Sequence, residues 1–418
     1  MSKDSRTYDV VVWGATGFTG KLVAEYMLEH YHDEFSWAIA GRSQRKLEAL
    51  RSDLTHIDPR AADLPILTGD SFDGDSLRAI AQSTKVVCTT VGPYAKYGAE
   101  LVAACVEHGT DYCDLTGEPQ FMRAMIDAHH EAAKESGARI VHTCGYDSIP
   151  SDIGTYALQQ FAVERAGAPA TDVTYYMWRA SGGFSGGTIA SAVEMFEQAT
   201  KDKNIRRVLG HPYSLNPQGE WSGEDGAPQS WAKYDRTIGS WTGPFVMASV
   251  NEKVVRRAHA LSGYPFGKSF RYREVMRLGR GLTGMLAAYA FSIAFAAFAA
   301  SLAIKPLRNL LAKYVLPKPG EGPSDEAIAK GFFETRLVGK VPTNAGSPKL
   351  VEMIVKAKGD PGYGATSMML SESAVCLAKD DAPEGITGGV LPPSVAMGEA
   401  LLTRLRSAGM TFQPRERV

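Results

Sequence analysis

The sequence is poor in cysteine and shows no pattern of metal ligands. Its 5 cysteines form no Cys-x-x-Cys pair and have no histidine at ligand spacing, so we expect neither a disulfide framework nor a metal site. An excess of charge is also lacking, because 45 lysines and arginines stand against 46 acidic residues. This balance argues against a nucleic-acid-binding protein. No basic segment leads into an apolar run near the first residue, so we expect no secretory signal and a cytoplasmic location.

The composition that is present is that of an ordinary globular protein. Hydrophobic residues make up 44% and charged residues 22% of the chain, which excludes long disordered regions, collagen-like repeats and coiled-coil rods. With 418 residues, the chain is long enough for two or three domains.

The first third of the chain alternates short apolar runs with helical patterns. The runs predict strands at 8–13, 36–40, 64–68, 86–90, 111–114 and 139–143, with helices at 18–30, 43–52, 75–83, 99–108 and 119–136. This alternation is typical of a Rossmann-type, doubly wound parallel sheet with crossover helices. We therefore expect the α/β class, with a nucleotide-binding domain at residues 1–152.

The pattern changes after residue 152. Strands are predicted at 171–180, 268–276, 331–338 and 350–358, and helices at 188–201 and 244–261. These elements indicate a second, α+β domain at 153–387, which we expect to bind the substrate or to form the interface of a homodimer. A last helix at 394–407 has one apolar side that needs a partner. We expect the C-terminal segment 388–418 to return to the first domain and pack on it.

A glycine-rich segment, GATGFTG, joins the first predicted strand to the first predicted helix. Glycines at every third position let the backbone turn tightly and approach a pyrophosphate, which the N–H groups and the dipole of the helix N-terminus attract. We expect Gly14, Thr16, Gly17, Phe18 and Gly20 to bind a dinucleotide. The alternative is a glycine-rich turn without a ligand.

The residues after the second predicted strand indicate which dinucleotide is bound. No acidic residue stands there to hold a ribose 2′-hydroxyl, whereas Arg42 and Ser43 can bind the 2′-phosphate of NADP(H). Arg42 could instead be a solvated residue at a helix start. Asp70 either binds the adenine or caps a helix. Gly92 and Pro93 follow the fourth predicted strand, where we expect the nicotinamide side.

Several ordered motifs resemble a known family. GATGFTG (14–20), AGR (40–42), VGPY (91–94), YCDLTGE (112–118) and GYDSIPSD (145–152) are together similar to the saccharopine dehydrogenase-like oxidoreductases. Within that family, four later motifs resemble the trans-acting enoyl reductase branch: SGGFSGGT (181–188), PFVMASVNEKVVRRAHAL (244–261), GDPGYGATSMML (359–370) and GGVLPPSVAMGEALLTRLRSAGMTF (388–412). The resemblance spans nearly the whole chain.

The resemblance implies an NADPH-dependent oxidoreductase that reduces an enoyl or carbonyl group of a lipid-like or polyketide-like substrate. Mycobacterial members of the branch act on lipid-polyketide precursors, and animal members are associated with lipid droplets, so lipid metabolism and glycolipid biosynthesis are the implied settings. One alternative is a non-catalytic NADP(H)-binding protein associated with a lipid or membrane partner. Another is a saccharopine-type amino-acid dehydrogenase, which needs several cations for a tricarboxylate substrate; the sequence shows no such cluster.

Hydride transfer calls for a group near the nicotinamide that stabilises or protonates the developing anion. We predict Tyr94 and Tyr146 as hydroxyl donors and Asp147 as an orienting group, because all three follow predicted strands at the carboxyl edge of the sheet. His142 lies inside an apolar run, which favours a core histidine. Glu118 is expected to be an acid at a helix start.

The segment 282–304 contains no charged residue. As a helix it would be about 34 Å long, enough to cross a hydrocarbon core of ~30 Å. Basic residues stand on both sides of it: Arg271, Arg273, Arg277, Arg280, Lys305, Arg308, Lys313 and Lys318. Cations at both ends favour a helix lying on a lipid surface, such as the cytoplasmic face of the plasma membrane, over a span. A buried core or dimer-interface helix is the other interpretation.

Overall fold

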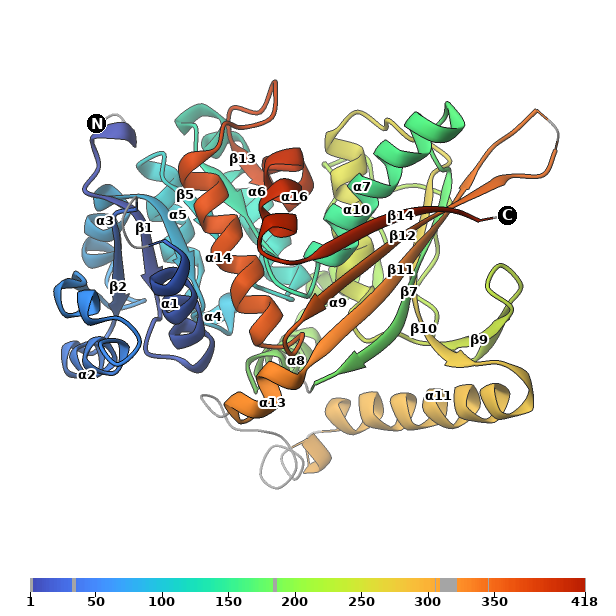
Figure 1. Cartoon of the computed structure of the whole chain (residues 1–418), viewed down its shortest axis with the longest axis horizontal. Coiled ribbons are helices and arrows are strands. Elements are labelled where there is room, and N and C mark those ends of the chain that lie inside the picture. The colour runs from blue at the N-terminus through green and yellow to red at the C-terminus, as the bar shows by residue number, and fades with distance from the viewer. Residues whose placement is uncertain are drawn as a thin grey trace.

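Two seven-stranded β-sheets with covering helices make up the computed structural model (Figure 1). The structure describes residues 3–31, 35–182, 186–304, 306–308, 322–344 and 346–417. Lys305, Lys313 and Lys318 lie outside these residues, as does part of the SGGFSGGT segment.

The first sheet is parallel throughout and has the order β13-β6-β5-β4-β1-β2-β3. Its strands are β1 (Tyr8–Trp13), β2 (Trp37–Gly41), β3 (Ile66–Thr68), β4 (Thr84–Thr89), β5 (Asp111–Cys113), β6 (Arg139–Val141) and β13 (Gly389–Leu391). Val10, Val11 and Val12 of the interior strand β1 are completely buried. This arrangement confirms the predicted Rossmann-type doubly wound fold.

Apart from the short helix α4, which was not predicted, the helices of this sheet begin and end close to the predicted positions. They are α1 (Phe18–His30), α2 (Gln44–Leu54), α3 (Gly74–Ser83), α4 (Tyr94–Tyr97), α5 (Ala99–Glu107) and α6 (Pro119–Ser136), with short 3₁₀ turns at Lys3–Ser5 and Pro59–Asp63. Helix α6 begins at Pro119, and Gly137 ends it in the left-handed conformation with φ of 77°. Proline at the first turn and glycine past the last turn are the usual signals of these boundaries.

The second sheet is mixed and has the order β14-β12-β11-β7-β10-β9-β8. Only β7 and β10 pair in parallel among its described strands. The strands are β7 (Asp172–Ser181), β8 (Lys233–Asp235), β9 (Ser240–Gly243), β10 (Arg271–Gly279), β11 (Phe332–Val341), β12 (Lys349–Lys358) and β14 (Thr411–Arg417). The four strands predicted after residue 152 are present as β7, β10, β11 and β12. The sheet also contains β8, β9 and β14, which the sequence patterns did not predict.

Most remaining helices belong to or border the second sheet. They are α7 (Ile149–Ala166), α8 (Gly186–Lys201), α9 (Lys203–Gly210), α10 (Ala248–Leu261), α11 (Gly281–Ala303) and α13 (Asp325–Lys330). Helix α7 packs on β11, β12 and α10. The predicted domain boundary at residue 152 therefore falls in the first turn of a helix that covers the second sheet.

The chain returns to the first sheet earlier than residue 388. Helix α14 (Gly364–Lys379), which was not predicted, packs against α1, β1, β4 and β5. It crosses the centre of the view in Figure 1 between the two sheets. The predicted helix at 394–407 is divided into α15 (Pro393–Ala396) and α16 (Gly398–Ser407) because Gly398 has a φ of 49°. Helix α16 packs on α14 and α7 and makes few contacts with the strands of the first sheet.

Candidate functional site

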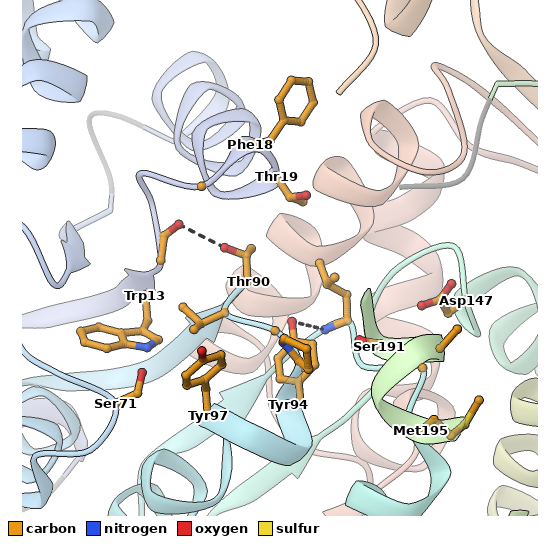
Figure 2. Close-up of a pocket in the computed structure, with 18 of the residues that line it drawn as sticks. Trp13, Phe18, Thr19, Ser71, Thr90, Tyr94, Tyr97, Asp147, Ser191 and Met195 are labelled. Carbon is orange, nitrogen blue, oxygen red and sulfur yellow. Dashed lines mark hydrogen bonds between the residues drawn. The ribbon is translucent and has the colours of Figure 1, made fainter. Parts of the chain in front are cut away.

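A cavity of about 480 Å³ lies at the carboxyl edge of the first sheet, where α8 and the start of α10 close it (Figure 2). Ligands in open α/β folds bind at this edge. Of the ten predicted cofactor-binding residues, eight line the cavity: Gly14, Thr16, Gly17, Phe18, Arg42, Asp70, Gly92 and Pro93. Gly20 and Ser43 do not line it. Ser43 instead accepts a hydrogen bond from the backbone N–H of Lys46 at 3.5 Å at the start of α2.

The glycines of the loop allow close packing around the start of helix α1 and leave its N-terminus uncapped. Gly14 has a φ of 87°, and a Cβ atom there would stand 2.4 Å from Cγ2 of Val91. At Gly20 a Cβ atom would stand 2.2 Å from the carbonyl oxygen of Gly14, so this glycine allows helix α1 to approach the loop. Gly17 precedes α1 and provides no capping side chain. The first-turn N–H groups of α1 are therefore available to an anion.

The residues at the adenosine end of the cavity are polar and aromatic. Arg42 is exposed, and no described residue forms an ion pair with its guanidinium. Asp70 does not cap a helix as the sequence alternative had it, because the N-cap of α3 is Asp73; the Asp70 carboxylate instead accepts a hydrogen bond from the N–H of Phe72 at 2.9 Å in the turn before that helix. The Phe72 side chain is 68% exposed and lies 5.6 Å from the Tyr97 ring. Phe72 was missed in the sequence, although an exposed aromatic ring that lines the same cavity as Arg42 suits stacking on a base.

Glu118 holds the loop that carries Gly92 and Pro93. Its carboxylate accepts hydrogen bonds at 2.9 Å from the N–H groups of both Tyr94 and Ala95, the first residues of α4. It also accepts one at 2.7 Å from the hydroxyl of Ser191 on α8. Burial raises the pKa of this carboxyl. Glu118 therefore caps α4 and links the first sheet to α8 behind the cavity.

Of the two tyrosines that were predicted as hydroxyl donors, one lines the cavity and the other does not. Tyr94 lines the cavity and is 3% exposed, but its hydroxyl donates to the carbonyl oxygen of Thr89 at 3.2 Å and accepts from the N–H of Leu115 at 3.5 Å (Figure 2). Tyr146 does not line the cavity. Its hydroxyl lies 3.1 Å from Sδ of Met177. Both phenols have raised pKa values because they are buried, and neither position supports the predicted role of hydroxyl donor.

Asp147 lies in the cavity wall, on the loop between β6 and α7 (Figure 2). Burial, with a smaller contribution from Asp114, raises the pKa of its carboxyl from 3.8 to about 7. No described residue donates a hydrogen bond to this carboxyl. Asp147 is therefore an acid that is part protonated near neutral pH and faces the space where a substrate would lie.

The neighbouring His142 belongs to the core, as its apolar surroundings in the sequence suggested. It is 4% exposed, and its Nδ1 atom lies 2.7 Å from the carboxylate of Asp114. Asp114 also accepts hydrogen bonds from Tyr112 and from the N–H of Thr116. This cluster ties β5 to β6 and does not line the main cavity.

The second half of the cavity wall comes from residues that were missed in the sequence. They are Ser191, Ala192 and Met195 of α8, Val246, Met247, Ser249 and Val250 at the start of α10, and Tyr363 before α14. The ring of Tyr363 packs edge-on against Phe18 at 4.7 Å. Most of these side chains are apolar. Among the described residues, Arg42 is the one cation that lines the cavity, and no cluster of three or more potential metal ligands is found.

Comparisons with known proteins agree with this geometry. Residues 10–141 match the saccharopine dehydrogenase NADP-binding domain. The trans-acting enoyl reductase of Mycobacterium bovis is 38% identical, with 99% of both chains covered. A second relative, from Mycobacterium tuberculosis, has been given the same name provisionally. It is 43% identical, with 99% of both chains covered.

A likeness in fold extends to an enzyme of known structure. Saccharopine dehydrogenase from Saccharomyces cerevisiae aligns with 98% of this chain and 99% of its own at a TM-score of 0.55, with 12% sequence identity. The fold, the glycine loop and the full-length relatives lead to one assignment. The chain belongs to the trans-acting enoyl reductase branch of the saccharopine dehydrogenase-like oxidoreductases and is an NADP-dependent oxidoreductase.

Proposed function

We propose that the protein reduces the carbon–carbon double bond of an α,β-unsaturated, lipid-like acyl substrate with NADPH. The observation that carries this proposal is Asp147, a carboxyl with a pKa of about 7 that faces the cavity beside the nucleotide loop. The names of the relatives support the enoyl group over a simple carbonyl.

Reduction of an enoyl group needs a hydride donor and a proton donor at the same site. Bound NADPH supplies a hydride for the β-carbon. The α-carbon must then receive a proton, and a donor with a pKa near the working pH is the most effective one. Asp147 meets this requirement, because burial keeps its carboxyl part protonated at neutral pH. In this proposal Asp147 is the proton donor, a different role from the orienting one predicted from the sequence.

The lining of the cavity supports an apolar substrate. Met195, Val246, Met247 and Val250 provide an apolar wall opposite the nucleotide loop. A saccharopine-type substrate carries three carboxylates and would need several cations, whereas Arg42 is the single cation among the described lining residues. An acyl chain fits this wall better than a tricarboxylate amino acid. We also propose a cytoplasmic location, which the five free, buried cysteines support.

The test is NADPH consumption with a medium-chain enoyl thioester, with the matching β-ketoacyl thioester as a comparison substrate. Saccharopine, which a saccharopine-type dehydrogenase oxidises, is tested separately by the reduction of NADP+. We expect turnover with the enoyl thioester and a fall in kcat above pH ~7 as Asp147 loses its proton. Asp147→Asn should lower kcat about 10²–10⁴-fold while NADPH affinity stays within about twofold. In deuterated water, one deuterium should appear at the α-carbon.

Three outcomes would contradict the proposal in different ways. Binding of NADPH without consumption on any substrate would favour the non-catalytic alternative. Turnover of saccharopine alone would favour the amino-acid dehydrogenase. Full activity of Asp147→Asn with the enoyl thioester would leave enoyl reduction standing and show that the proton comes from another group.

A further inference from the structure

Helix α11 is a long apolar helix on the outside of the molecule. It runs below the second sheet in Figure 1, where it packs on β9, β10 and α8. Its segment Gly281–Leu302 is long and apolar enough to cross a membrane, yet only 17% of its most apolar stretch is buried in the protein. A helix of this composition is normally covered by protein or lipid.

In α11 several large apolar residues are exposed while small or polar residues are buried, the opposite of what is usual for the surface helix of a water-soluble protein. Ala288 and the polar Ser292 are completely buried against the protein. Leu282, Leu286 and Ile293 are exposed by 68%, 59% and 57%. The small residues Gly284, Ala288 and Ser292 therefore face the protein, whereas Leu282, Leu286 and Ile293 face outward and form an exposed apolar surface.

An aromatic cluster borders the first half of this helix. Trp231 and Trp241 lie 6.3 and 6.0 Å from the ring of Tyr289 on α11, and Tyr234 lies 5.6 Å from Trp241. Trp231 and Tyr234 are exposed by 47% and 46%. Tryptophan and tyrosine collect where a protein meets the boundary between lipid and water, because their rings are apolar and their edges are polar.

The charges in this region are basic. Lys233 and Arg236, in the same hairpin as the aromatic residues, and Arg280, which precedes α11, are exposed, and no described acid forms an ion pair with them. The other flanking arginines differ from the expectation drawn from the sequence, because three of them are paired: Arg271 with Glu224, Arg273 with Asp235, and Arg308 with Glu197. Among the flanking residues that the structure describes, Lys233, Arg236 and Arg280 are thus exposed cations without an acidic partner, and they lie in the hairpin and the segment before α11.

We propose that the outward side of α11, with the aromatic cluster and Lys233, Arg236 and Arg280, docks on an anionic lipid bilayer and lies parallel to its surface. The apolar side chains would enter the acyl boundary, the rings would lie at headgroup level, and the three cations would contact anionic headgroups. The helix does not cross the bilayer, because its packing on β9 and β10 fixes it along the sheet.

A second copy of the chain fits this surface less well than lipid. In a symmetric dimer the same patch meets itself, and because the patch as defined contains no acidic residue, its three cations would find no acidic partner on a second copy of it. Anionic lipid instead neutralises them. The proposal stands on the surface of α11 and does not depend on the proposed reaction.

The experiment is flotation of the full-length protein with two kinds of vesicle, phosphatidylcholine alone and phosphatidylcholine with about one-third phosphatidylglycerol. We expect the protein to float with the anionic vesicles, less with the neutral ones, and less at high salt. Leu286→Glu and Ile293→Glu should each lower partitioning about tenfold or more. Replacing Lys233, Arg236 and Arg280 by glutamine should lower it about fivefold for each charge.

The matched control is Ile57→Glu, which places the same charge at an apolar residue that is 44% exposed and follows α2, far from this surface. The control should float like the unchanged protein, and all variants should keep their affinity for NADPH, which verifies the fold. Equal losses in the control and the α11 variants would overturn the proposal. So would a protein that ignores both vesicles, or one that sediments as a dimer that Leu286→Glu dissociates, because a second copy would then be the occupant.

Discussion

Replacing Asp147 by asparagine should make the protein more stable at alkaline pH. In the folded protein the pKa of this carboxyl is raised from 3.8 to about 7. Below pH ~4 it is protonated in both the folded and the unfolded chain, so it contributes no difference between them. Between pH ~4 and ~7 the folded protein holds a proton that the unfolded chain has lost. The ionised carboxyl therefore disfavours the folded state increasingly as the pH rises through this window.

The size of the effect follows from the shift in pKa. About three pKa units at 1.36 kcal/mol each set an upper limit of ~4 kcal/mol. Asp147 lines a cavity that water can enter, so we expect about 2 kcal/mol above pH 7. Asparagine has a similar shape and does not ionise. The variant should thus lose activity and gain stability together, as is common for groups kept for function.

The assay is thermal unfolding of both proteins from pH 4.5 to pH 8.5. The difference in unfolding temperature should be small at the acidic end and should grow in favour of Asp147→Asn up to about pH 7. Glu135→Gln, an exposed residue on α6, controls for the removal of one negative charge. A difference that does not change with pH, or a variant that is less stable at pH 8, would refute the reasoning.

Other residues give further predictions. Arg42→Ala should weaken NADPH binding about tenfold, from the loss of ~1.5 kcal/mol of charge-assisted bonding by an exposed side chain, and should leave NADH binding unchanged; titration of the two cofactors by fluorescence checks this, and equal losses would contradict the 2′-phosphate assignment. Gly20→Ala should lower both the unfolding temperature and NADPH affinity because its Cβ would stand 2.2 Å from the Gly14 carbonyl oxygen, whereas Gly210→Ala, with no neighbour within 4 Å, should change neither. Truncation after Thr387 removes β13 and β14 and should lower the unfolding temperature; an unchanged melting curve and cofactor affinity would show that the last strands are dispensable.

The sequence predicted the first sheet well because its signals are local. Helices α1 and α6 begin and end where the pattern of apolar residues, Pro119 and Gly137 indicated. Helix α14 was missed because it is buried on nearly all sides, so that it has no polar face and no amphipathic period. Its three serines and its threonine are buried like its apolar residues, so the two kinds of residue do not separate onto two faces.

Only the side of the candidate site that the first sheet forms could be predicted from the sequence. The carboxyl ends of parallel strands meet at one edge, so the glycine loop, Arg42 and Asp147 could be brought together from the order of the strands alone. The wall formed by α8 and α10 depends on how the second sheet packs against the first, which no local pattern records. The raised pKa of Asp147 was also out of reach, because it arises from burial in the folded chain.

The two last strands of the chain have a consequence for its synthesis. Strand β13 completes the first sheet beside β6, and β14 completes the second sheet beside β12. On a ribosome that adds ~5–20 residues per second, roughly 12–50 s pass between the synthesis of β6 and that of β13. Through that interval the nascent nucleotide-binding sheet has an open edge and lacks α14 over β1, β4 and β5. Chaperones would therefore meet this protein as an unfinished sheet, and a ribosome that stalls before residue 389 would carry a chain in which both sheets still lack an edge strand.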